Sequence, residues 1–317
     1  MKYSPYMLEP SGVAGLASPD YLDFIDRTVF EAGLKLLYER HRLRPDFPYP
    51  DTKFNPNTGA DLPPESYDEL YPWFFGRGAE ACAAHLCIID RIDGLNDIRR
   101  EIRSMLEGFV FSLTDAVLLT VKTNNGRCPF RVDRGFRAIK AGGAPAEVDT
   151  SGRGAGDLFC AKGLLASASS PKIEVGKRMF DEYVKAVFDQ RVLSEQSPGN
   201  RALVGQGACM LALGAIPLLL KASSGAELAS YADTAAALLN FVLERHFDEA
   251  GGRFSEYVSR DTAERGEYID PGHATELVGL GIQAVAAVKS ACPDASAEIQ
   301  RACTPVSYTH LTLPTKR

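Results

Sequence analysis

The sequence predicts an all-α protein built as a toroid of helical hairpins, an α/α barrel with short β-hairpin excursions. Apolar residues recur at the helical period along most of the chain. The predicted helices are of two kinds, one charged along one face and one rich in Gly, Ala and Cys with almost no charge. The two kinds alternate, as the outer and inner helices of a toroid would. A plain bundle needs no such alternation, and a stacked solenoid would repeat more evenly.

The helices that carry charge on one face are expected on the outside, with that face in water. They span residues 21–43, 97–123, 171–192 and 226–247. Ser18-Pro19-Asp20 supplies a start signal for the first of them.

The nearly uncharged helices are expected inside, because small residues let helices approach closely. They span residues 65–92, 156–169, 201–222 and 271–291, and another helix begins near Ala295. Loops are predicted over 45–64 and 142–154, and β-hairpins over 128–141 and 251–257. If the inner helices all point the same way, their N-termini line one mouth of the barrel.

Composition excludes several classes of protein. The chain has 317 residues, a net charge of −6 and 24% charged residues, which argues against a nucleic-acid-binding protein and against wholesale disorder. No run of eighteen apolar residues predicts a membrane-spanning helix. Seven cysteines with no CxxC pair suggest neither a disulfide framework nor a zinc ribbon. With no signal-peptide core at the N-terminus, we expect a cytoplasmic protein.

The last residues differ from the rest. PVSYTHLTLPTKR has no helical period, interrupts a helix that has barely begun, and resembles translated adaptor sequence. We therefore expect a single barrel domain over residues 1–303, incomplete at its C-terminus, followed by a non-native tail over 304–317. A genuine extended tail is the alternative.

The strongest candidate site lies at the start of the helix over 271–291. Asp270 is a good N-cap and Pro271 suits the first helical position, so His273 falls in the first turn and Glu276 one turn later on the same face. The positive end of the helix dipole disfavours a cationic imidazole, so we expect a neutral ring that can act as a general base. Glu276 would hydrogen-bond a substrate hydroxyl or orient the ring. A capped helix with a satisfied polar pair is the structural alternative.

Arg77 is the second candidate. It stands between glycines at the start of an apolar stretch, and a fixed guanidinium suits a developing oxyanion. A salt bridge to Glu80 or Asp157 is the alternative. Trp73, one turn before Arg77, is a candidate for substrate binding, with packing as the alternative.

Other signals predict no cofactor. Gly152–Gly156 lacks the rest of a phosphate-binding fingerprint, and no second histidine stands at zincin spacing, so we expect neither a nucleotide nor a metal. His246 ends a predicted outer helix, where a positive charge would suit the dipole.

Four segments together resemble the N-acylglucosamine 2-epimerase family, whose superfamily includes cellobiose 2-epimerases and aldose–ketose isomerases. They are WFFGRGAEA, GDLFCAKGLLASA, HFDEAGGRFSEYVSRD and, most specifically, EYIDPGHATELVGL, and the resemblance runs from about Tyr21 to Ala291. It implies an (α/α)6 barrel and proton transfer at C2 of a free reducing sugar, through a cis-enediolate.

The resemblance also implies roles for individual residues. By motif match, His273 takes the place of one catalytic histidine, Glu276 that of a glutamate that assists by hydrogen bonding, and Arg77 that of an arginine that steadies the oxyanion. Asp157 and Asn200 lie at inner-helix openings and are expected to bind substrate. The family's second histidine lies beyond the point where the tail begins, and His310, within the tail, is a poor substitute.

Two other functions stay open. One is a glycan-degrading enzyme on the same barrel, such as an unsaturated glucuronyl hydrolase, with Asp157 as its acid/base. The other is a sugar-binding protein without turnover. The expected partner is a small-molecule sugar, with no nucleic acid and no membrane, and the sequence leaves a homodimer as an option.

Overall fold

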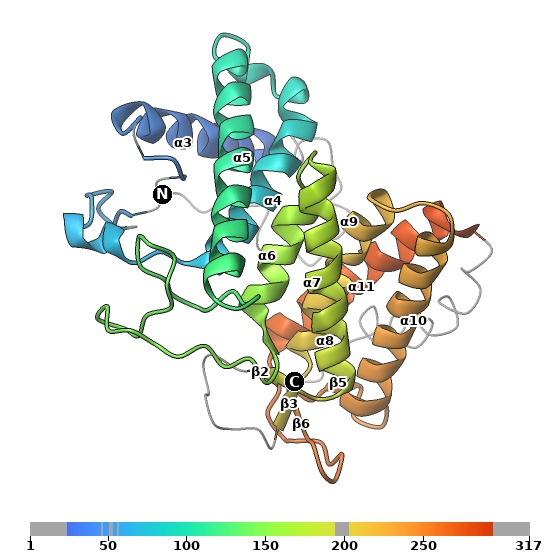
Figure 1. The fold of residues 1–317 in the computed structure, drawn as a ribbon. Coiled ribbons are helices and arrows are strands. Elements are labelled where there is room, and N and C mark those ends of the chain that lie inside the picture. Colours follow the sequence, from blue (N-terminus) through green and yellow to red (C-terminus); the bar gives the residue numbers. More distant parts are fainter. Residues whose placement is uncertain (1–23, 46, 51–52, 56, 194–202, 294–317) are drawn as a thin grey trace. The chain divides into compact units, whose positions relative to one another are not determined.

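The computed structural model describes residues 24–45, 47–50, 53–55, 57–193 and 203–293. Within these residues the protein is mostly helical, as predicted (Figure 1). Contacts divide the chain into two compact units. Unit 1 comprises the described residues up to Tyr67 together with Gly78–Leu113, and unit 2 comprises Asp68–Arg77 and the residues from Thr114 onwards. The expectation of one domain over residues 1–303 stays a prediction, and residues 304–317 lie outside the described residues.

Unit 1 is built around the first predicted outer helix. Its described part passes from the π-helical segment η2 (Asp26–Glu31) into α3 (Ala32–Leu43). Two 3-10 turns, η4 (Ile89–Arg91) and η5 (Asp93–Leu95), lead to α5 (Arg99–Thr123), which was predicted over 97–123. The core of the unit contains the fully buried side chains of Ile89, Leu95, Ile102 and Leu106.

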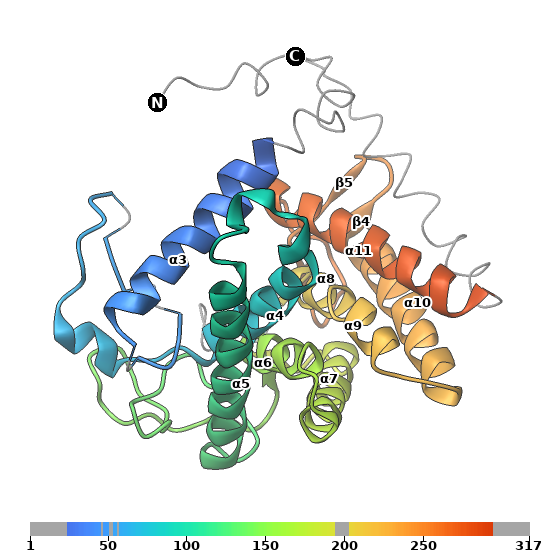
Figure 2. The ribbon, with the colours of Figure 1, turned by 90° about the horizontal axis from the view of Figure 1, so that it is seen from above.

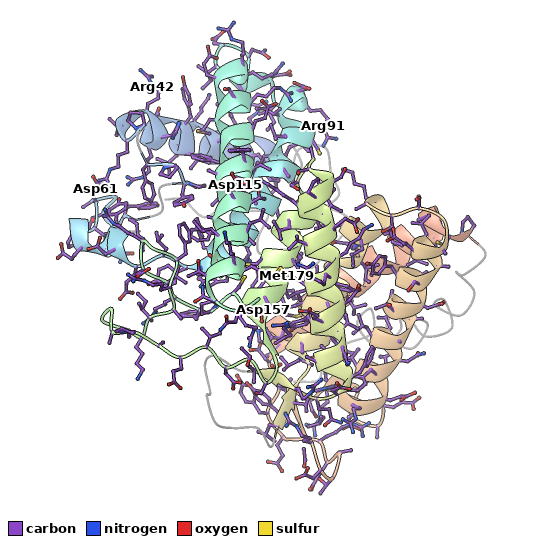
Figure 3. The ribbon with its side chains drawn as sticks, viewed as in Figure 1. Arg42, Asp61, Arg91, Asp115, Asp157 and Met179 are labelled. Carbon is purple, nitrogen blue, oxygen red and sulfur yellow. The ribbon has the colours of Figure 1, made fainter. Side chains whose placement is uncertain are left out.

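Unit 2 shows the alternation of inner and outer helices. α6 (Ala155–Leu165) buries nine of its eleven residues, as expected of an inner helix. α7 (Ser170–Phe188) packs along it and buries one face, which includes Met179 (Figures 1 and 3). α10 (Ala226–His246) likewise buries one face, against α8 (Gly207–Leu213), α9 (Ile216–Lys221) and α11 (Pro271–Ala291) (Figure 2).

α11 departs from the full burial expected of an inner helix. Its buried residues form one stripe against α8, α9 and α10. They are Ala274, Leu277, Gly281, Ala284 and Val288. On the other side Ile282 is 59% exposed. The nearly uncharged sequence of this helix therefore reflects packing on one side within the described residues.

Two predicted inner helices are wrong at their starts. The helix predicted over 65–92 begins as α4 (Pro72–Ile88), after a 3-10 turn η3 (Pro64–Asp68). Leu70 pairs with Val132 on a distant segment through two backbone hydrogen bonds of 2.9 Å, and Pro72 disfavours a helical conformation at the residue before it.

The helix predicted over 201–222 is divided. Residues 201 and 202 lie outside the described residues, Leu203–Gly205 form strand β3, and the helical part is split into α8 and α9. Pro217 has no amide hydrogen to continue the first helix, and it sits in the first turn of α9, where none is needed.

The strands are short and local. β1 (Arg153–Gly154) pairs in parallel with β2 (Val192–Leu193). β4 (Phe247–Asp248) pairs with β5 (Arg253–Phe254), which confirms a β excursion at the predicted place. β3 pairs antiparallel with β6 (Tyr257–Ser259).

The hairpin predicted over 128–141 is present in a reduced form, in which Val132 bridges Ala138 antiparallel and the Asp133 amide donates to the Arg137 carbonyl at 3.0 Å. Val132 forms only isolated bridges, one of them to Leu70 on another segment. A turn with Phe136 at φ 62° closes Asp133–Arg137, so no regular ladder develops.

α5 is the described helix that is long and apolar enough to cross a membrane by length and composition. Core helices of soluble proteins pass the same test, so this is weak evidence for a span. The expectation of no membrane contact stays a prediction.

Candidate active site

The first turn of α11 places His273. Asp270 is the N-cap, as predicted, and its Oδ1 accepts a hydrogen bond from the His273 amide at 3.0 Å. Pro271 occupies the first turn, where its missing N–H costs nothing. The Asp270 cap and Pro271 together fix the backbone at His273.

Glu256 holds the ring of His273. Its Oε1 lies 3.1 Å from the His273 Nδ1, and its Oε2 accepts a hydrogen bond of 2.9 Å from Gln206 Nε2. The carboxylate is buried, with 5% of the side chain exposed, whereas 45% of the His273 side chain is exposed. No described residue hydrogen-bonds His273 Nε2, so that nitrogen is the one a ligand would meet.

The helix dipole predicts a lowered pKa for His273, and this direction is wrong. Burial lowers the pKa of His273, but the hydrogen bond and charge of Glu256, with smaller contributions from Asp270 and Glu276, outweigh it and raise the pKa above its ordinary value. The helix dipole is a local effect, whereas the Glu256 carboxylate comes from another segment of the chain. A raised pKa makes the imidazolium more accessible, which suits a group that both accepts and returns a proton.

Glu276 lies one turn after His273 and is exposed. Its charge acts on His273, but Glu256 makes the hydrogen bond that orients the ring. The prediction that Glu276 orients the ring is therefore corrected in favour of Glu256. A hydrogen bond from Glu276 to a substrate hydroxyl stays a prediction.

Arg77 is exposed on α4, and its guanidinium lies over the ring of Phe159 on α6, 5.1 Å from the ring centroid. Among the described residues no carboxylate pairs with it, so the alternative of a salt bridge to Glu80 or Asp157 is not seen. A guanidinium that stacks on an aromatic ring keeps its N–H donors available in the plane of the group.

Trp73 belongs to an aromatic cluster at the start of α4. It stacks on Phe130 with ring centroids 6.1 Å apart and also meets Tyr71 edge-on. Its buried Nε1 has no hydrogen-bond partner among the described residues. Phe130, 39% exposed, is the more accessible ring of the stack. Packing accounts for Trp73, and its contact with substrate stays a prediction.

Asp157 has a structural environment. It lies near the start of α6 (Figure 3), is 1% exposed and accepts three hydrogen bonds. The donors are Arg127 Nε at 2.9 Å, the Cys128 amide at 2.7 Å and the Gly154 amide at 2.9 Å. This placement counts against the prediction that Asp157 binds substrate, and against its use as an acid/base. Asn200 lies outside the described residues.

Gln206 and Glu256 are the site residues that sequence reasoning missed. Glu256 stands in HFDEAGGRFSEYVSRD, one of the four segments that carry the resemblance, and Gln206 stands in the inner helix predicted over 201–222. The available signal was a carboxylate two residues from the apolar Phe254 and Val258, within the predicted β excursion. Within the described residues no group of three or more His, Cys, Asp or Glu side chains is placed to hold a metal ion. The expectation of no metal stays a prediction.

Comparison with known proteins supports the fold. No family model matches the chain. No curated protein matches it by sequence. Among solved structures, a cellobiose 2-epimerase from Bacillus thermoamylovorans is similar, with a TM-score of 0.54 and 12% identity over 76% of this chain. The match covers 60% of that structure's chain. The described helices therefore have the (α/α)6-barrel type of fold that this epimerase has.

Proposed function

We propose that the protein is a sugar 2-epimerase or aldose–ketose isomerase that acts on a free reducing sugar. The observation that carries the proposal is His273, a half-exposed imidazole fixed at a helix N-terminus with Glu256 on its Nδ1. The similarity of fold to a cellobiose 2-epimerase supports the same chemistry.

The reaction would begin at C2 of the open-chain sugar. The neighbouring C1 carbonyl makes the C2 hydrogen acidic, and neutral His273 removes it as a general base. The electron pair of the C–H bond forms the C1–C2 double bond of a cis-enediolate, and the charge moves to O1. Arg77 is our candidate for stabilising this oxyanion, because its N–H donors are free of carboxylates among the described residues.

The fate of the proton distinguishes the two reactions. Return of a proton to C2 on the opposite face gives the epimer and needs a second acid. Transfer of the proton to C1, with the O2 hydroxyl proton passing to O1, gives the ketose. The described residues supply His273 for the first step, and the resemblance assigns the opposite face to a second histidine. The choice between epimerase and isomerase depends on that group.

The test is isotope exchange. The full chain is incubated in D₂O with reducing sugars, including cellobiose, N-acetylglucosamine and glucose, and deuterium at C2 is followed by NMR. We expect incorporation by the wild-type protein and a loss of at least about 100-fold in His273→Asn, since acid–base groups contribute rate factors of this order. A folded wild-type protein that exchanges no sugar would overturn the proposal. Calorimetric binding of a sugar without exchange would instead support the non-catalytic alternative.

A hydrolase is the weaker candidate. Its acid/base would be Asp157, whose carboxylate is buried and bound by three protein donors. Release of free sugar from an unsaturated disaccharide, abolished in Asp157→Asn with the fold intact, would favour it.

A further inference from the structure

We propose that Glu256, seated by Gln206, is the positioning residue for His273, so that Nδ1 carries its proton toward Glu256 and Nε2 is the atom that exchanges the substrate proton. The assignment of Nε2 to proton transfer rests on the proposed function. The hydrogen bond and the tautomer of the ring do not depend on it.

The backbone of Glu256 is held from both sides. In the β3–β6 pair, Gly205 lies opposite Tyr257. The pairing continues one residue further, where the Gln206 amide donates to the Glu256 carbonyl at 2.9 Å, and the Glu256 amide donates to the Tyr268 carbonyl, also at 2.9 Å. Gln206 is fixed in turn because its carbonyl accepts the first hydrogen bonds of α8. The carboxylate therefore projects from a rigid frame.

The side chain of Glu256 is equally constrained. Gln206 is fully buried, and its amide nitrogen faces the Glu256 Oε2. Rotating the amide by 180° would set Gln206 Oε1, which has no partner among the described residues, against a carboxylate oxygen, and both atoms only accept. Gln206 therefore fixes one oxygen of Glu256 and leaves the other for His273.

An ionised carboxylate determines the tautomer of its histidine partner. Because Glu256 Oε1 can only accept, His273 Nδ1 must carry the hydrogen, and the neutral ring keeps a bare lone pair on Nε2. The same charge stabilises the imidazolium once Nε2 has taken a proton. The neighbouring acids Asp270 and Glu276 act in the same direction. From α8, Cys209 is buried, which raises its pKa to about 12, so it adds no charge.

The proposal is tested on the full chain without any sugar. Protein labelled with ¹⁵N-histidine is titrated by NMR, with His273→Asn identifying the signal. In the wild type we expect the neutral ring to be the Nδ1–H tautomer and the midpoint to lie above that of a free histidine. In Glu256→Gln, where shape is kept and charge is lost, the midpoint should move down. Glu267→Gln, the same change at an exposed position of the neighbouring loop, should leave the midpoint where it is.

A neutral wild-type ring protonated on Nε2 would overturn the proposal, and this holds even if Glu256→Gln fails to fold. An unchanged midpoint in folded Glu256→Gln, judged by circular dichroism, would also overturn it. Glu256→Asp keeps the charge and should recover part of the upward shift.

A second measurement separates this inference from the proposed function. If wild-type protein exchanges deuterium into a sugar, Glu256→Gln should lower kcat on the order of 100-fold, move the acid limb of its pH profile toward lower pH and leave KM nearly unchanged. A rise in KM with kcat unchanged would contradict a positioning role. If the NMR results are as expected but the wild type exchanges no sugar, the Glu256–His273 pair is supported and the assignment of Nε2 to catalysis is overturned.

Discussion

At the scale of single residues, two buried carboxylates have different surroundings. Asp157 receives its hydrogen bonds from a buried guanidinium and two backbone amides, all of them groups of the fold itself. Glu256 divides its oxygens between a buried amide and a half-exposed imidazole. The first arrangement stabilises the fold, and the second leaves one partner facing solvent.

This difference predicts that Asp157→Asn weakens the fold. The change leaves the buried Arg127 guanidinium, 5% exposed, without its counter-charge. Breaking one side of a buried ion pair costs about 3–5 kcal/mol. Denaturation by urea should therefore show a much lower midpoint. Asp115→Asn is the matched control, because Asp115 pairs with Lys172 but is 48% exposed, and loss of such a pair costs about 1 kcal/mol or less. Unchanged stability with lost sugar exchange would contradict the structural role of Asp157.

The position of His273 could be predicted because the capping motif is local. Asp270, Pro271 and His273 are neighbours in sequence, and the hydrogen bond they predict is present. Glu256 could not be found in this way. Its contact with His273 depends on the pairing of β3 with β6 and on the fold of the intervening loop, which no local pattern encodes. The direction of the His273 pKa shift could not be predicted for the same reason, because Glu256 raises that pKa.

At the scale of elements, close approach of α4 and α6 explains why the inner helices contain glycine. A Cβ atom on Gly76 would lie 2.0 Å from the Phe159 carbonyl oxygen, and one on Gly163 would lie 2.7 Å from the Gly76 Cα. Two glycines thus face each other where the helix backbones cross. The small residues read from the sequence as helix contacts serve that purpose here.

We therefore expect Gly76→Ala to destabilise the protein, although alanine is the better helix former. The methyl group meets backbone atoms that cannot move aside, and overpacking of this kind costs about 1–3 kcal/mol or more. Gly279→Ala in α11 is the control, because a Cβ there meets nothing within 4 Å. It should be neutral or stabilise by about 0.5–1 kcal/mol. Thermal unfolding of both variants decides the point: equal effects would show that the crossing is not tight.

Helix periods predicted the long elements well and their interruptions poorly. The starts of α5, α7, α10 and α11 fall within two residues of the predicted positions. The errors occur at Pro72 and Pro217, where the apolar pattern continues across a residue that the backbone cannot accommodate inside a helix. The alternation over 128–141 predicted the bridge between Val132 and Ala138 but not the pairing of Val132 with Leu70, because a distant partner leaves no trace in the local sequence.

At the scale of the whole molecule, alternating inner and outer helices predicted the fold class that structural comparison supports at 12% identity. Burial on one face or on all faces is imposed by packing, so it persists where individual residues have changed. The site depends on single side chains. For this reason the fold could be derived from pattern, while the substrate and the second acid/base group are left to experiment.

His246 affects the stability of the whole molecule through pH. It ends α10 fully buried, and its Nδ1 donates to the Ser255 carbonyl at 3.0 Å. Burial lowers its pKa to about 4, and Arg245 and Arg265 add to the effect, although the hydrogen bond to Ser255 opposes it. The residue is therefore neutral near pH 7, and the positive charge expected at this helix end is absent.

Because the unfolded chain binds a proton at His246 with an ordinary pKa of 6.5 and the folded chain only near pH 4, the stability from His246 is present above pH 6.5 and is lost as pH falls toward 4. The loss at pH 4 is on the order of 3 kcal/mol. For His273, whose folded pKa is raised, stability is instead present below pH 6.5 and is lost as pH rises through the folded value. The free energy of unfolding, measured by urea at intervals from pH 4 to 8, should fall less steeply on the acid side in His246→Asn than in the wild type. Since carboxylates titrate equally in both proteins, parallel acid limbs would show that His246 is not the buried neutral group described here.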